Sequence, residues 1–277
     1  MKRGVRGERT RTRRIVRAGC ATLAAGCALF ASACSGSGSG VTVAADPAAA
    51  VRQAGTASSR IGSSAVATSV TMTSGGKTEQ FSGTGSFDFT RQIGSITLVV
   101  PPEVNAKGTL DEVVTPTTLY MRPTGSTAKW VRVDSDKLAD GDLISAGYTS
   151  PVLAFAMLAG AGAAGGTVTY VGQDKVYNTP VAHYSGTLNL AAAAAAASAP
   201  LNSALASASR SFTKQSVPFD VYLDAKGQVL RFVAHFAFPA PAPQKGEVTI
   251  VSSTDIYDLG KPVKVAAPPA ADVLQAG

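Results

Sequence analysis

Apolar and polar residues alternate with a period of two over much of the chain beyond residue 80. In QFSGTGSFDF (80–89), Phe81, Phe87 and Phe89 fall on one face with two glycines, and polar side chains occupy the other face. Such alternation predicts a β-strand with one buried and one solvated face. The same pattern, interrupted by Gly, Pro or Asn turns, predicts further strands at 92–100, 108–114, 118–122, 129–133, 166–176, 179–190, 218–238 (as a hairpin) and 246–260.

Other segments depart from this period and predict helices. The first begins after Asp46, which is placed to cap it, and Pro47 suits its first turn. The last combines the alanine run 191–197 with residues 200–212, and we expect it to break or kink at Pro200.

A third helical segment, SPVLAFAMLAGAGAAGG (150–166), is different in character because it is apolar nearly all round. Ser150 is its expected cap, and Pro151 takes the first helical position. A helix on the protein surface carries a polar face. This one is therefore expected to be buried, or to line or cover an apolar space.

The elements together predict one α+β domain over residues 46–277, with about ten antiparallel strands and helical inserts. Gly83, Gly85 and Gly186 interrupt its apolar strand faces. These gaps have two interpretations. Glycine can permit close packing or sheet curvature in an ordinary filled core, or the sheet can curve so that its concave face keeps an apolar cavity open beneath helix 151–159.

The first 33 residues have the three parts of an export signal. Residues 1–17 are rich in Lys and Arg, residues 18–30 are uncharged, and the small residues 31–33 form a cleavage site before Cys34. The uncharged stretch is shorter than the ~20 apolar residues of a transmembrane helix. We therefore expect residues 1–33 to be a signal peptide. The arginine pair in TRRIVR leaves open whether export follows the general or the twin-arginine route.

LFASAC (29–34) resembles a bacterial lipobox, where a signal peptidase cuts before a cysteine that then carries acyl chains such as palmitate. Cys34 is the expected lipid anchor, and LAAGC makes Cys27 the alternative. Each acyl methylene buried in a membrane contributes about 0.8 kcal/mol. Residues 34–45, which include the SGSGSG repeat, then predict a flexible tether.

Recognising this boundary changes the electrostatic picture. The 277-residue chain has a formal net charge of +7, and the eight Lys or Arg and one acid before Cys34 account for all of it. The neutral remainder has no basic stripe, so we expect no nucleic-acid partner. Cys20, Cys27 and Cys34 are the three cysteines, and none falls in the predicted domain. The domain must therefore rely on its core rather than on a disulfide.

Residues for catalysis are sparse. The chain has two histidines, His183 and His235, each on the more polar face of a predicted strand, where a solvated or hydrogen-bonded histidine is the usual finding. GAGAAG (160–165) follows a helix and precedes a strand, which is the reverse of a dinucleotide-binding turn. We expect no catalytic residue, metal site or cofactor. An anchored hydrolase is the least favoured function, and it would need a serine within reach of one histidine.

Several segments resemble the LppX/LprAFG family of actinobacterial lipoproteins. They are DPAAAVRQAGTASSRIGSSAVATSVTMT, VTYVGQDKVYNTPVAHYSGTLNL, VPFDVYLDAKGQVLRFVAHF and IYDLGKPVKVAAPP, within residues 46–269. The resemblance implies a strongly curved antiparallel sheet, or half-barrel, with helices covering an apolar cavity. It also implies an acylated lipid or glycolipid ligand at the cell envelope. The alanine run 191–197 and the low aromatic content depart from the family.

These observations lead us to expect a non-enzymatic lipid carrier, anchored to the outer, extracytoplasmic face of the cell membrane. Its partners would be the membrane, the lipid and a membrane transporter. The residues expected to contact the lipid tails are Phe155, Met157, Leu158, Phe232 and Phe236. The alternative is a structural, partner-binding or stress-sensing lipoprotein. That alternative predicts dry, closed packing beneath helix 151–159.

Overall fold

The structure is a computed structural model, and it describes residues 41, 43–102, 108–134, 138, 150–240, 243 and 245–274. All described residues belong to one compact unit, residues 39–277. The predicted signal peptide and both candidate anchors, Cys27 and Cys34, lie outside the described residues.

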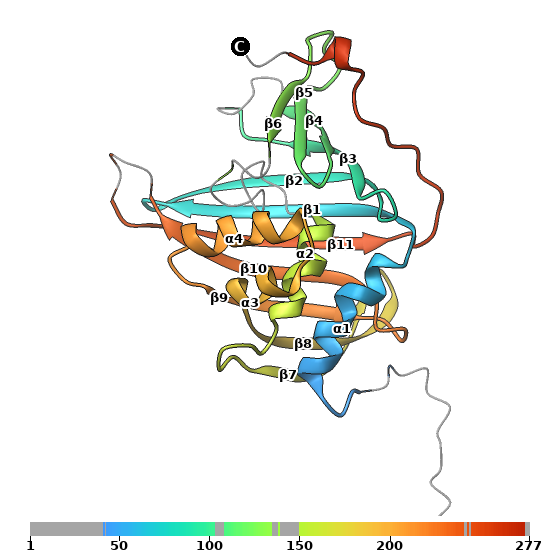
Figure 1. Ribbon diagram of the computed structural model, residues 1–277, viewed down its shortest axis with the longest axis vertical. Coiled ribbons are helices and arrows are strands. Elements are labelled where there is room, and N and C mark those ends of the chain that lie inside the picture. The colour runs from blue at the N-terminus through green and yellow to red at the C-terminus, as the bar shows by residue number, and fades with distance from the viewer. Residues whose placement is uncertain are drawn as a thin grey trace, which may run out of the picture. The chain divides into compact units, whose positions relative to one another are not determined.

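In the described part of the chain, eleven strands form one open antiparallel sheet (Figure 1). Their order across the sheet is β6-β5-β4-β3-β2-β1-β11-β10-β9-β8-β7. The strands are β1 (Ser63–Ser74), β2 (Lys77–Asp88), β3 (Ile93–Val99), β4 (Thr109–Val114), β5 (Thr118–Pro123), β6 (Val131–Asp134), β7 (Val168–Val176), β8 (Thr179–Asn189), β9 (Ser216–Leu223), β10 (Val229–Pro239) and β11 (Glu247–Tyr257). The predicted α+β class with an antiparallel sheet is confirmed.

The centre of the sheet joins the first and last strands of the domain. Strand β1 pairs with β2 through a two-residue turn, where Gly75 and Gly76 take φ values of 56° and 78°. Both angles lie in the left-handed region that glycine adopts without a steric cost. On its other side β1 pairs with β11, so that Thr68 lies opposite Thr254. This long-range pairing joins the two halves of the sheet, β1–β6 on one side and β7–β11 on the other, into one continuous sheet.

Helices cover one face of this sheet (Figure 1). They are α1 (Pro47–Ser59), α2 (Pro151–Met157) with the short 3₁₀ turn η2 (Leu158–Gly160), α3 (Leu190–Ala196) and α4 (Leu201–Ser211). The Asp46 carboxylate caps α1 by accepting a hydrogen bond from the Ala49 N–H at 2.9 Å, as predicted. None of the described helices is long and apolar enough to cross a membrane.

One expectation about the helices needs correction. Pro151 does begin α2, but the Ser150 side chain makes no capping hydrogen bond. At Pro200 the sequence predicted a break or a kink, and the structure has a break, because α3 ends at Ala196 and α4 starts at Leu201. Helix α2 is buried, as its apolar sequence predicted: Val152, Leu153 and Phe155 are 8 %, 4 % and 4 % exposed.

The glycine gaps on the strand faces are occupied by neighbouring atoms. A side chain at Gly83 would bring a Cβ atom to 2.6 Å from Leu98 Cδ2, and one at Gly85 would meet the Ser95 carbonyl oxygen. At Gly186 the obstacle is the Thr167 carbonyl oxygen. At these three positions glycine therefore permits close packing, which was the first of the two interpretations.

The Pro-rich C-terminal segment is packed against the domain. It runs from the end of β11 to the region of β4–β6 and includes η3 (Ala270–Asp272) (Figure 1). The Trp130 N–H donates to the Asp272 carbonyl oxygen at 2.7 Å, and the Leu274 N–H donates to the Trp130 carbonyl oxygen at 2.8 Å. Val265 and Val273 pack with Trp130 on the sheet face away from the helices. We call residues 261–274 the C-terminal strap.

Candidate functional site

The five residues predicted to contact lipid tails lie in one apolar core. Phe155, Met157 and Leu158 from α2 and η2 are 4 %, 0 % and 0 % exposed, and Phe232 and Phe236 from β10 are each 2 % exposed. Their side chains pack against further aromatic rings. The Phe155 ring lies 5.2 Å from that of Phe89, and the Phe236 ring lies 5.0 Å from that of Phe212. The structure thus places all five in the same packed apolar core.

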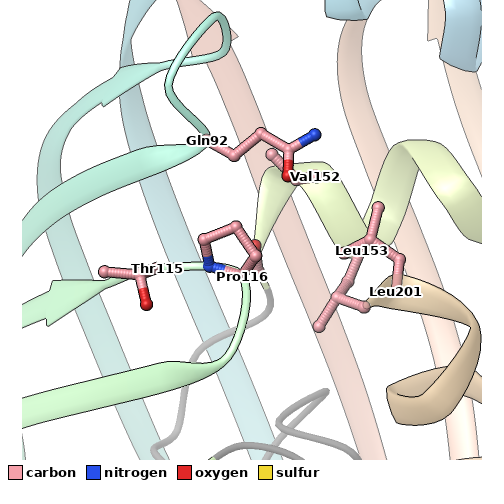
Figure 2. A pocket seen from close by; sticks show the side chains of 7 residues that line it. Gln92, Thr115, Pro116, Val152, Leu153 and Leu201 are labelled. Atoms are coloured by element: carbon pink, nitrogen blue, oxygen red, sulfur yellow. The ribbon is translucent and has the colours of Figure 1, made fainter. Parts of the chain in front are cut away.

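A small cavity lies at the outer end of this core (Figure 2). It is formed where the first turns of α2 and α4 meet the β2–β3 and β4–β5 turns. The cavity has a volume of about 10 Å³, which is about what one water molecule needs. Figure 2 shows Gln92 and Pro116 on one side and Leu153 and Leu201 on the other. Thr115, Ser150 and Val152 complete its lining. We call it the inner cavity.

A larger cleft of about 290 Å³ adjoins the inner cavity, and Pro116 lines both. It lies between the β5–β6 hairpin and α4. Five of its eight lining residues have polar side chains, namely Thr117, Thr118, Arg132, Asp134 and Ser203. Pro116, Pro200 and Ala204 complete the lining, whose exposed surface is more apolar than polar. An Arg132 guanidinium nitrogen lies 3.0 Å from an Asp134 carboxylate oxygen, and the Arg132 side chain is 55 % exposed. We call this cleft the outer cleft.

Local hydrogen bonds fix the turn that separates the two hollows. The Thr118 N–H donates to the Thr115 hydroxyl oxygen at 3.0 Å, and that hydroxyl donates to the Thr118 carbonyl oxygen at 3.0 Å. The Thr115 N–H donates to the same carbonyl. Threonine in this role closes a tight turn without glycine. Pro116 is therefore held between the outer cleft and the inner cavity.

The sequence predicted a turn between the strands on either side of TPTT (115–118), which is correct. It did not indicate that the residues of this turn belong to the candidate site. Its position against α2 and α4 depends on contacts between segments tens of residues apart. A local pattern carries no signal of such contacts.

His183 is hydrogen-bonded, as its place on a polar strand face predicted. Its Nε2 lies 2.7 Å from the Asp220 carboxylate, and its ring stacks on Tyr222 at 4.3 Å between centroids. This nitrogen therefore faces a carboxylate rather than a serine hydroxyl. His235 is exposed on β10. Asp220 supplies the carboxylate that a hydrolase would place beside its histidine, but in the part of the chain that the structure describes no serine hydroxyl is hydrogen-bonded to His183.

The described end of the expected tether contacts the domain. Val41 is 7 % exposed and belongs to the main apolar core. Its carbonyl oxygen accepts a hydrogen bond from Gln173 Nε2 at 3.5 Å, and the Ala44 N–H donates to the Tyr184 hydroxyl at 3.4 Å. Contacts with the domain thus begin at residue 41 rather than at residue 46.

The described chain is an α+β half-barrel: an open antiparallel sheet whose apolar face carries a layer of helices. No protein-family model and no curated protein matches it. Similar solved structures include the lipoprotein LppX of Mycobacterium tuberculosis, with 12% identity, a TM-score of 0.46, and coverage of 79% of this chain and 97% of that chain.

LprF of Mycobacterium bovis has 15% identity and a TM-score of 0.40, covering 80% of this chain and 99% of that chain. The LolA superfamily protein NE2245 of Nitrosomonas europaea has 8% identity and a TM-score of 0.35, covering 78% and 96%. At these identities the likeness concerns the fold alone.

Proposed function

We propose that this chain is a lipid-anchored lipoprotein that binds the acyl part of a lipid or glycolipid between its sheet and its helices. One observation carries the proposal: the outer cleft, which offers hydroxyls, a guanidinium and a carboxylate, adjoins the apolar inner cavity at Pro116. An amphiphile has the same order of groups, because its headgroup is polar and its chain is apolar. Binding sites for such ligands are mostly apolar, with a few polar groups that fix orientation.

The acyl chain would enter along α2. Val152 and Leu153 border the inner cavity, and Phe155, Met157 and Leu158 follow them toward the core. Since these side chains are packed and the inner cavity is small, entry requires the first turns of α2 and α4 to move apart. Burying ten methylenes contributes about 8 kcal/mol. That gain must offset the cost of separating these turns and of immobilising the ligand.

The headgroup would remain in the outer cleft. Thr117, Thr118 and Ser203 offer hydroxyl groups there, and Arg132 offers N–H donors. Hydroxyls and a guanidinium suit the hydroxyl groups of a sugar or the oxygens of an ester or phosphate. An acylated glycolipid therefore fits the outer cleft better than a plain fatty acid does.

The anchor and the location follow from the sequence. Acylation of Cys34 would hold the domain at the outer face of the cell membrane, and a membrane transporter would supply or accept the lipid. We expect the protein to leave the lipid chemically unchanged. The ligand contacts would be apolar side chains, hydroxyls, the Arg132 guanidinium and the Asp134 carboxylate.

A charge placed in the inner cavity tests the proposal. Leu201 is half-buried and lines the inner cavity, and the adjacent Asn202 is exposed. Leu201→Arg should weaken binding of a fluorescent long-chain acyl probe tenfold or more, because the chain would have to pass a charged group in an apolar passage. Asn202→Arg adds the same charge one residue away and should bind like wild type. Equal binding by both variants, with unchanged circular dichroism, would contradict this route of entry.

One observation favours a second function, in which the chain is an interaction or stress-sensing lipoprotein with a filled core. The five predicted contact residues are packed, and neighbouring atoms fill the glycine gaps. This function predicts that wild type itself binds no acyl probe. The same titration therefore separates the two functions.

A further inference from the structure

Three hydroxyl side chains lie together in the middle of the apolar face of the sheet. Thr68 on β1 is paired with Thr254 on β11, and Ser252 lies two residues before Thr254 on the same face. These strands are the sixth and seventh of the eleven. The three side chains are 5 %, 1 % and 2 % exposed, respectively. We call them the central hydroxyl patch.

The central hydroxyl patch adjoins the predicted lipid contacts. Phe232 on β10 is paired with Thr254, and Phe236 lies four residues further along that strand on the same face. Gly83 on β2 lies opposite Thr68 on the other side. In Figure 1, α2 and α4 pass over the strands that carry the patch. The hydroxyls thus face the interior between the sheet and the helices.

The Thr254 hydroxyl is the unusual member. The Thr68 hydroxyl donates to the Ser253 carbonyl oxygen at 3.3 Å, which is a bond within the sheet. The Thr254 hydroxyl is buried and has no hydrogen-bond partner within the described part of the chain. Most buried polar groups in proteins are hydrogen-bonded, and a buried group without a partner needs an explanation, such as a water or an ion that binds it. The polar group of a ligand could bind it in the same way. A valine in its place would have nearly the same shape and no such requirement.

We infer that the central hydroxyl patch is an interior subsite for a polar group carried on the buried part of the lipid. That group is a chain hydroxyl or an ester carbonyl, either of which can bond to the Thr254 hydroxyl. The inference rests on the proposed function and narrows it. The preferred ligand is a hydroxylated or ester-branched acyl chain rather than a plain hydrocarbon chain.

A competition experiment tests this preference. The full chain, released from membranes in a non-ionic detergent, is mixed with stearate and an equal amount of a hydroxystearate. A series of hydroxystearates places the hydroxyl at different carbons, and native mass spectrometry gives the ratio of the two complexes. Wild type should favour one member of the series about fivefold over stearate, as expected for one hydrogen bond. Thr254→Val should bring that ratio to one.

Each other outcome counts against the inference. If no hydroxystearate is favoured, or Thr254→Val keeps the preference, the subsite is wrong although stearate binding still supports the proposed function. If stearate does not bind either, the proposed function fails and the subsite fails with it.

Thermal unfolding of the delipidated chain is the second readout. Thr254→Val should raise the Tm, because it removes an unpaired buried hydroxyl, and Thr68→Val should lower it by removing a bonded one. A lower Tm for Thr254→Val would mean that a resident water satisfies the hydroxyl, which would overturn the subsite.

Discussion

Replacing Val273 with Asp should detach the C-terminal strap from the domain. Val273 is 8 % exposed, and it forms a bridge with Trp130 in a cluster that includes Val265. Burial of each valine contributes about 1.5–3 kcal/mol. Val273→Asp loses that contribution and would in addition bury an unpaired carboxylate, which is unfavourable. The variant should therefore release the strap from the domain.

The chain contains one tryptophan, so its fluorescence reports on the strap directly. Trp130 is 8 % exposed, and both its backbone hydrogen-bonding groups engage the strap. Val273→Asp should expose the indole, shift its emission to longer wavelength and increase quenching by acrylamide. The matched control is Leu274→Asp at a side chain that is 50 % exposed, which should leave the emission unchanged. An unshifted spectrum in Val273→Asp would refute the packing argument.

Two further predictions concern the anchor and the pH dependence of stability. Cys34→Ala should move the protein from the membrane fraction to the soluble fraction, and retention in the membrane would indicate Cys27 as the anchor. Partial desolvation by neighbouring groups, followed by a hydrogen bond to Asp255, raises the pKa of the Tyr177 hydroxyl to about 12 from its ordinary value of 10.0, although 56 % of the residue is exposed. The unfolded chain therefore loses this proton at lower pH than the folded chain, and the stabilisation present below pH 10 is lost as pH rises toward 12. Urea denaturation across that range should show that the free energy of unfolding declines with pH, and that the decline is smaller in Tyr177→Phe. Equal declines in wild type and Tyr177→Phe would contradict the raised pKa of Tyr177.

Local patterns were sufficient to predict much of the fold. Alternation placed β2 with Phe81 and Phe87 on its buried face, and Asp46 marked the start of α1. The all-round apolar sequence of α2 predicted its burial, because such a helix has no face that water solvates well. In each case the signal lies within a few residues of the feature that it predicts.

Features that depend on distant contacts could not be predicted in this way. The strap has the sequence of a Pro-rich tail, and nothing in residues 261–274 indicates that Trp130 lies beside them. The inner cavity and outer cleft meet at Pro116 because β5, α2 and α4 converge there. The central hydroxyl patch likewise arises from pairing β1 with β11, strands at opposite ends of the domain sequence.

The most direct test of lipid binding is native mass spectrometry of the full chain purified from the membranes of an actinobacterial host. The anchor lipid adds a covalent mass that survives denaturation, whereas a bound lipid is lost when the protein is denatured. We predict an additional non-covalent mass of one acylated lipid or glycolipid per chain, reduced in Leu201→Arg and retained in Asn202→Arg. A native mass that matches the covalently anchored chain alone would contradict the proposal that this protein carries lipid.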